Sequence, residues 1–155
     1  MSFLIRGLDP GLFRHLVGAA DGALAERQVE RRIADAKPGF PCRISLEDAD
    51  PGDSLLLLNH ESHAAPTPYR SAYAIFINEK SREAAVYRDE IPPVMRSRPI
   101  ALRHFSAEGR LVGASLALKG DSREAILAAF GDDRVAYIHA HNAAHGCFAA
   151  EVLRD

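Results

Sequence analysis

Short apolar segments separated by turn-forming residues run through the whole chain, and most connections between them are too short to hold a helical crossover. Strands joined in this way pair antiparallel, because two parallel neighbours need a connection of roughly a dozen or more residues. About nine segments have strand character, including 55–58, 72–78, 100–105 and 135–142. The pattern therefore predicts a mainly antiparallel sheet of several short strands.

Helical periodicity is clearest at residues 122–130. Asp121 or Ser122 stands where a helix cap is expected, and Gly131 follows the last apolar residue. One or two shorter helices are expected in the first half of the chain. Two or three helices with an antiparallel sheet make an α+β fold, and 155 residues suit a single domain over residues 1–155.

The charge pattern argues against several classes of protein. The formal net charge is −2, and no long block of basic residues is present, so no nucleic-acid partner is expected. No apolar run approaches the ~20 residues of a membrane span, so no membrane partner is expected either. The chain also shows no basic-then-apolar leader. We therefore expect a cytoplasmic protein whose two cysteines, Cys42 and Cys147, are free thiols.

The stretch YIHAHNAAHGCF, residues 137–148, concentrates the residue types that carry chemistry. Side chains alternate along a strand, so His139 and His141 share one face and Asn142 points to the other. Two imidazoles on one face can move protons or bind one divalent metal such as zinc. A catalytic zinc needs about three protein ligands, and candidates for the third are Cys147, His60 and His63.

Whether Cys147 joins these histidines depends on the register of the last hairpin. A four-residue loop pairs Asn142 with Cys147 and leaves the thiol on the opposite face from the imidazoles. A five-residue loop, or a bulge at Gly146, would bring the thiol among them. The sequence leaves both arrangements open, and His145 is interpreted as a loop residue.

Cys42 and Arg43 form a second candidate site, at the start of a strand expected over 42–46. A neighbouring guanidinium favours the thiolate, so Cys42 is a candidate nucleophile with a histidine as its base. Asn142 has the residue type that orients the imidazole in Cys-His-Asn enzymes, although it points away from His141. The alternative is that Cys42 is a small buried apolar side chain.

A third candidate site lies in the loop that precedes the strand at 72–78. Tyr69 and Arg70 are placed there, and Arg70 together with Arg43 would clamp a small anionic ligand. His60 follows the strand at 55–58 and is a further candidate for ligand binding. Here the alternative is a loop fixed by packing and by hydrogen bonds to backbone carbonyls.

Several segments resemble one bacterial family, the domain of unknown function 1203. They are DAKPGFPCRISLEDADPGD, LLLLNH, TPYRS, AIFI and YIHAHNAAHGCFAAEV. The opening FLIRGLD and the turn FSAEGRLV look similar too, so the resemblance extends over nearly the whole chain. The resemblance implies which positions belong to the family motif, and no reaction, substrate or cofactor. Those positions are Cys42, Arg43, Tyr69, Arg70, His139, His141, Asn142, Gly146 and Cys147.

Two hypotheses of function follow, with a structural role for these residues as a third. The first is a small-molecule enzyme with a polar pocket, in which Arg43 and Arg70 bind an anionic substrate and His139, His141 or Cys42 does the chemistry. The second is a non-catalytic ligand-binding or interaction module whose histidines are fixed by backbone hydrogen bonds. The substrate and the oligomeric state are left open.

Overall fold

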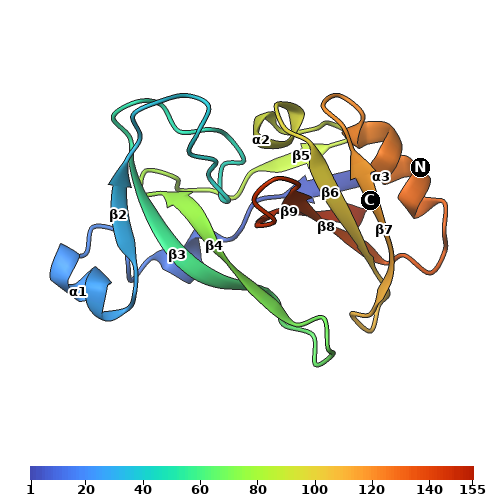
Figure 1. The fold of residues 1–155 in the computed structure, drawn as a ribbon, viewed down its shortest axis with the longest axis horizontal. Coiled ribbons are helices and arrows are strands. Elements are labelled where there is room, and N and C mark those ends of the chain that lie inside the picture. Colours follow the sequence, from blue (N-terminus) through green and yellow to red (C-terminus); the bar gives the residue numbers. More distant parts are fainter.

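The computed structural model describes all of residues 1–155 and contains two antiparallel sheets, which stand side by side in Figure 1. The larger sheet has six strands in the order β5-β1-β9-β8-β6-β7. Its strands are β1 (Phe3–Arg6), β5 (Val86–Arg88), β6 (Ile100–Phe105), β7 (Leu111–Ala117), β8 (Tyr137–Asn142) and β9 (Phe148–Arg154).

The smaller sheet has three strands in the order β2-β3-β4, and it lies on the left of Figure 1. They are β2 (Glu30–Ile33), β3 (Ser54–His63) and β4 (Ser71–Asn78). The helices are short: a 3-10 turn (Pro10–Phe13), α1 (Asp21–Glu26), α2 (Pro93–Arg96) and α3 (Ser122–Phe130). The predicted α+β fold with a mainly antiparallel sheet is confirmed.

The main core lies between one face of the larger sheet and helix α3. Ile138 and Ala140 of β8 are fully buried there against Ile126 and Phe130 of the helix. Burial of each large side chain stabilises the fold by about 1.5–3 kcal/mol. Because strand side chains alternate, the other face of β8 carries the aromatic and imidazole rings and points toward the smaller sheet.

Aromatic contacts join the two sheets on that second face. The ring of His63, at the end of β3, stacks on Phe105 of β6 with centroids 4.1 Å apart. Tyr73 of β4 meets His141 of β8 edge-on at 5.0 Å. The predicted histidine face is thus the surface on which the small sheet docks.

The prediction of a strand at 42–46 is wrong. Cys42, Ile44 and Leu46 are all buried, as the alternation indicated, but the backbone turns there. The Leu46 amide donates to the Cys42 carbonyl, and Leu46 has a positive φ of 56°. A compact turn therefore buries the same apolar side chains that a strand would.

Two further expectations differ from the structure. Residues 59–63, expected to begin a loop, continue β3, because β4 pairs with them up to a bulge between Glu61 and His63. Helix α3 forms as predicted, but Asp121 makes no side-chain capping bond and the Ser122 hydroxyl is buried without a partner. The packing of its apolar face, rather than its cap, stabilises this helix.

Candidate functional site

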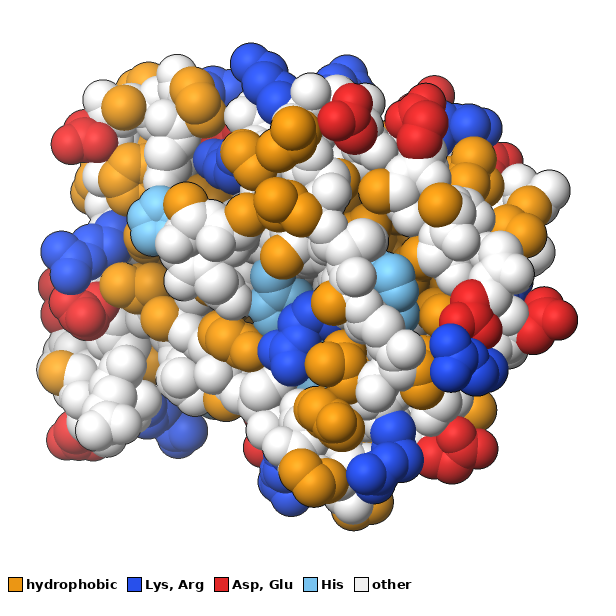
Figure 2. Space-filling view, turned by 45° about the vertical axis from the view of Figure 1, so that its right-hand side comes forward, with side chains coloured by type: hydrophobic (Ala, Val, Ile, Leu, Met, Phe, Trp, Pro, Cys, Tyr) orange, Lys and Arg blue, Asp and Glu red, His pale blue; other side chains and the backbone are white.

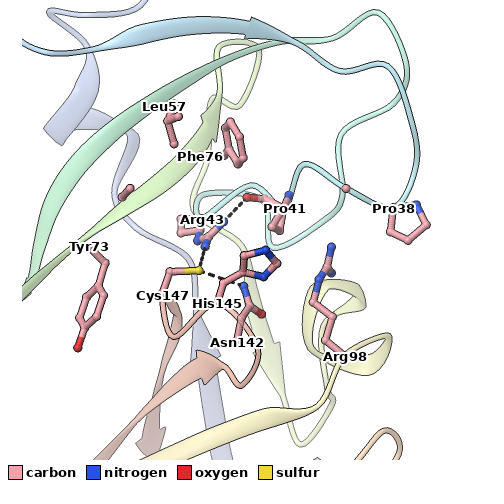
Figure 3. A pocket seen from close by; sticks show the side chains of 12 residues that line it. Pro38, Pro41, Arg43, Leu57, Tyr73, Phe76, Arg98, Asn142, His145 and Cys147 are labelled. Atoms are coloured by element: carbon pink, nitrogen blue, oxygen red, sulfur yellow. Dashed lines mark hydrogen bonds between the residues drawn. The ribbon is translucent and has the colours of Figure 1, made fainter.

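A cavity of about 530 Å³ lies between the smaller sheet, the loop before Arg43 and the β8–β9 turn. Figure 3 shows Cys147 near the middle of this pocket, with Tyr73 on one side and Arg98 on the other. About half of the lining residues are apolar or aromatic, and most of the others carry polar groups. The lining residues are Pro38, Gly39, Pro41, Arg43, Leu57, Tyr73, Ala74, Phe76, Arg98, Asn142, His145 and Cys147.

The thiol of Cys147 accepts two N–H groups at the surface of the pocket. Arg43 Nη2 lies 3.2 Å from Cys147 Sγ, and Asn142 Nδ2 lies 3.4 Å from it, as the dashed lines in Figure 3 show. Cys147 itself is half-buried and faces the cavity. The sulfur is therefore the acceptor in both contacts, one of them with a charged donor.

Arg43 is a buried cation without a carboxylate partner. Its side chain is 3 % exposed, Nε donates to the carbonyl of Phe148, and Nη1 donates to that of Pro41. Burial lowers the pKa of Arg43, while the two cysteine sulfurs act in the opposite direction. A buried charge costs several kcal/mol unless it is paired. The Cys147 thiolate, or an anion in the pocket, would provide that pairing.

Arg98 also lines the pocket, but its charge is already balanced. Its two terminal nitrogens bind both carboxylate oxygens of Asp48, at 2.6 and 3.0 Å. Burial raises the pKa of Asp48, but the ion pair with Arg98 outweighs this and the net shift is downward. Asp48 also accepts the amide of Gly39, so the pair holds the loop that forms one wall of the pocket.

The register of the last hairpin separates Cys147 from the histidine face. The turn has four residues, with the Asn142 amide donating to the Cys147 carbonyl and His141 opposite Phe148. A bulge follows, at Ala149 rather than at Gly146. Cys147 therefore lies beside Asn142, and the arrangement that placed the thiol among the imidazoles is wrong.

On the opposite face, three histidines form a buried imidazole cluster: His63, His139 and His141 are 2 %, 3 % and 4 % exposed. His63 Nδ1 donates to the carbonyl of Tyr69, so its Nε2 accepts the hydroxyl of Tyr137 at 2.7 Å. His141 Nδ1 donates to the carbonyl of Gly146 at 2.9 Å. Burial lowers the pKa of His63, and it lowers that of His141 to about 4, so both rings are neutral at pH 7.

The cluster does not have the geometry of a metal site. His139 and His141 share a face as predicted, but their ring centroids are 6.5 Å apart and both nitrogens of His63 are hydrogen-bonded. No group of three or more His, Cys, Asp or Glu side chains is arranged to hold a metal ion. The cluster is instead built from ring packing and hydrogen bonds to backbone carbonyls.

Of the predicted site residues, the structure brings Arg43 and Asn142 into the pocket. Cys42 is 1 % exposed, and its sulfur accepts the Asn78 amide, so it lies in the core and not at the cavity. The Arg43–Arg70 clamp does not form, because Arg70 is exposed and pairs with Glu61.

The other predicted residues also lie outside the pocket lining. His60 packs edge-on against Phe13, and the Tyr69 carbonyl is the acceptor for His63. Tyr73, Arg98 and His145 line the pocket without having been identified from the sequence. No local motif marks the first two, while His145 belongs to the motif-rich turn and was assigned there only as a loop residue.

The fold and the site together define an α+β protein with two antiparallel sheets and a pocket that presents a thiol to a buried arginine. Residues 39–154 match the family described as "Protein of unknown function (DUF1203)", and the chain belongs to this family. The pocket lies almost entirely within the matched segment. Neither the curated proteins nor the solved structures include a match. None of the helices is long and apolar enough to cross a membrane.

Proposed function

We propose that this protein is a thiol-dependent enzyme that acts on a small anionic molecule, with Cys147 as the nucleophile. The observation that carries the proposal is the Arg43 guanidinium, which is buried without a carboxylate and donates to Cys147 Sγ beside an open pocket. Cys147 thus replaces Cys42, the candidate nucleophile from the sequence, in this proposal.

The pocket walls support a ligand with two chemical parts. Leu57, Phe76 and Ala74 offer an apolar surface to a hydrocarbon or ring, while Arg43 supplies positive charge beside Cys147. An anionic group placed near Arg43 would bring the adjacent electrophilic carbon toward the sulfur. In that step the thiolate electron pair forms the S–C bond, and the leaving group departs with the electron pair of the bond that breaks.

The test is the pH dependence of alkylation by iodoacetamide, with the modified cysteine identified by mass spectrometry. We expect Cys147 to react at pH 7 and Cys42 to stay unmodified in the folded protein, because only Cys147 reaches the pocket. Arg43→Met should slow the reaction of Cys147 about tenfold or more, since a hydrogen bond to a charged group contributes about 1.5–3 kcal/mol.

Two controls keep this test decisive. Arg43→Lys retains the charge and should keep part of the reactivity. Asn142→Leu removes the other donor and should slow alkylation even if the Arg43 variants do not fold. Equal alkylation rates at pH 7 for the wild type and for folded Arg43→Met and Asn142→Leu proteins would overturn the proposal.

A non-catalytic ligand-binding module is the second candidate, and one observation favours it. The rings of His63 and His141 are fixed by backbone carbonyls, as expected for histidines with a structural role. In that case the pocket binds its ligand and the thiol takes no part. A screen of small carboxylates by thermal shift separates the two functions, because binding alone predicts that Cys147→Ser keeps every stabilising ligand and that Cys147 shows no enhanced alkylation.

A further inference from the structure

A second arginine without a carboxylate partner lies on the other side of Tyr73 from Cys147. Arg103 of β6 is half-buried, and its only hydrogen bond runs from Nη1 to the hydroxyl of Tyr73, at 3.0 Å. It takes part in no ion pair. Its Nε and Nη2 donors therefore have no protein acceptor.

A small side chain leaves space beside Arg103 on the β7 side of this face of the sheet. In the register, Arg103 lies between Ala114 of β7 and His139 of β8, and Ala101 lies directly opposite His141. Ala114 is exposed, so no large side chain lies beside Arg103 on the β7 side. On its other sides lie the ring of His139 and the ring of Phe105, whose centroid is 5.8 Å from the guanidinium carbon. Figure 2 shows histidine side chains and a basic side chain gathered near the middle of this face.

The neighbouring imidazole supplies an acceptor with a fixed proton position. Because His141 Nδ1 donates to the Gly146 carbonyl, its Nε2 carries a lone pair in the neutral ring, and that atom has no hydrogen-bond partner. Burial, with a smaller effect from the positive charges of Arg103 and Arg43, holds the pKa of His141 at about 4, so Nε2 remains an acceptor at pH 7. His139 makes no hydrogen bond, and its Nε2 lies 3.8 Å from the half-exposed carboxylate of Glu151.

We propose that Arg103 and His141 form a binding site for a singly protonated phosphate group, either free hydrogen phosphate or the monoanion of a phosphate monoester. Two phosphate oxygens accept the free N–H groups of Arg103, which match such a group in bidentate geometry. The remaining P–OH donates to His141 Nε2. The site is separate from the thiol pocket, because neither Arg103 nor His141 lines that cavity and only Tyr73 belongs to both.

The contact between the phosphate hydroxyl and His141 Nε2 should make the site selective for phosphate over sulfate. Sulfate has nearly the same shape and charge, but at neutral pH it has no proton to give to His141 Nε2. Phosphate should therefore bind about tenfold more tightly than sulfate, as expected when one hydrogen bond is lost and a lone pair faces an anion. A general attraction to positive charge would treat the two ions alike.

The test is an NMR titration of the protein with inorganic phosphate and with sulfate at pH 7, following the arginine Nε–H and histidine ring signals. We expect saturable shifts of Arg103 and His141 with phosphate, unchanged in Cys147→Ser and in Arg14→Met, which removes an exposed arginine elsewhere. Arg103→Met should abolish the saturation. A parallel titration with a phosphate monoester distinguishes a free ion from a phosphorylated small molecule.

A second variant covers the case in which Arg103→Met does not fold. His141→Asn keeps a donor for the Gly146 carbonyl but loses the Nε2 acceptor, so phosphate affinity should fall about tenfold to that of sulfate. Absence of saturation in the wild type, equal binding of the two ions, or full phosphate affinity in a folded Arg103→Met protein would each overturn the proposal. Because Cys147→Ser leaves the expected result unchanged, the outcome does not depend on the proposed enzyme.

Discussion

Acidification should destabilise this protein well above the pH at which carboxylates protonate, and His141 is the main reason. Burial lowers the pKa of His141 from 6.5 to about 4, and the bond to the Gly146 carbonyl opposes this shift only in part. In the unfolded chain, His141 therefore binds a proton near pH 6.5, whereas in the folded protein it binds one only near pH 4. Stability contributed by the neutral ring is complete above pH 6.5 and is lost as the pH falls toward 4.

The linkage relation gives the magnitude. Between pH 7 and pH 5, His141 alone should reduce the free energy of unfolding by about 2 kcal/mol. Burial also lowers the pKa values of His60, His63 and His104, so the total loss should be larger. Carboxylates contribute little in this window, because Glu79, with a pKa of about 2, is ionised in both states until the pH approaches 4.5.

Urea denaturation followed by circular dichroism at pH 7, 6 and 5 measures this loss. The matched variant is His141→Asn, which does not titrate and places an amide N–H where His141 Nδ1 donates. Its free energy of unfolding should fall by about 2 kcal/mol less than that of the wild type over the same interval. The reasoning is refuted if the two proteins lose stability equally, or if the wild type is unchanged between pH 7 and pH 5.

Three substitutions test contacts that stabilise the fold, each by urea denaturation at pH 7. Tyr137→Phe keeps the ring but leaves His63 Nε2 buried without a donor, so it should cost about 1–3 kcal/mol, and no change would contradict the hydrogen bond. Gly109→Ala should cost about 2–5 kcal/mol, because Gly109 has φ +76° and a Cβ there would lie 2.3 Å from Ala65 Cβ. Ser122→Ala should leave stability unchanged or raise it by up to about 1 kcal/mol, since it removes a buried hydroxyl without a partner, and a loss above that would mean the hydroxyl is bonded.

The alternation of side chains along β8 allowed the sequence to predict which residues face the core and which form the histidine face. The pleat fixes a period of two, so Ile138 and Ala140 had to enter a core once His139 and His141 pointed elsewhere. The same reasoning failed at Cys42–Leu46, because a turn can bury alternate side chains as well as a strand does. Burial patterns therefore located the core more reliably than they assigned backbone geometry.

The alternation pattern could not predict on which face of the sheet Cys147 lies. Two arrangements of the hairpin differ by one residue, and a shift of one residue moves every following side chain to the other face. The bulge at Ala149 interrupts the alternation of β9, so that Phe148 lies against the imidazole rings while Ala150 lies on the core face opposite Ala140. Nothing in its local sequence requires a bulge.

Charge pairing decides which arginines remain for a ligand, and it is a tertiary property. Three arginines lie near the two sites, but Arg98 is neutralised by Asp48, 50 positions away. Arg43 meets only carbonyls and a thiol, and Arg103 meets a hydroxyl and the ring of Phe105, so neither is paired with a carboxylate. Sequence adjacency suggested that Arg43 serves Cys42; the fold turns Cys42 into the core and brings Arg43 to Cys147, 104 positions away. If unpaired cations mark ligand sites, thiol chemistry should respond to changes at Arg43 and phosphate binding to changes at Arg103, while substitutions at Arg98 should act through the stability of the pocket wall.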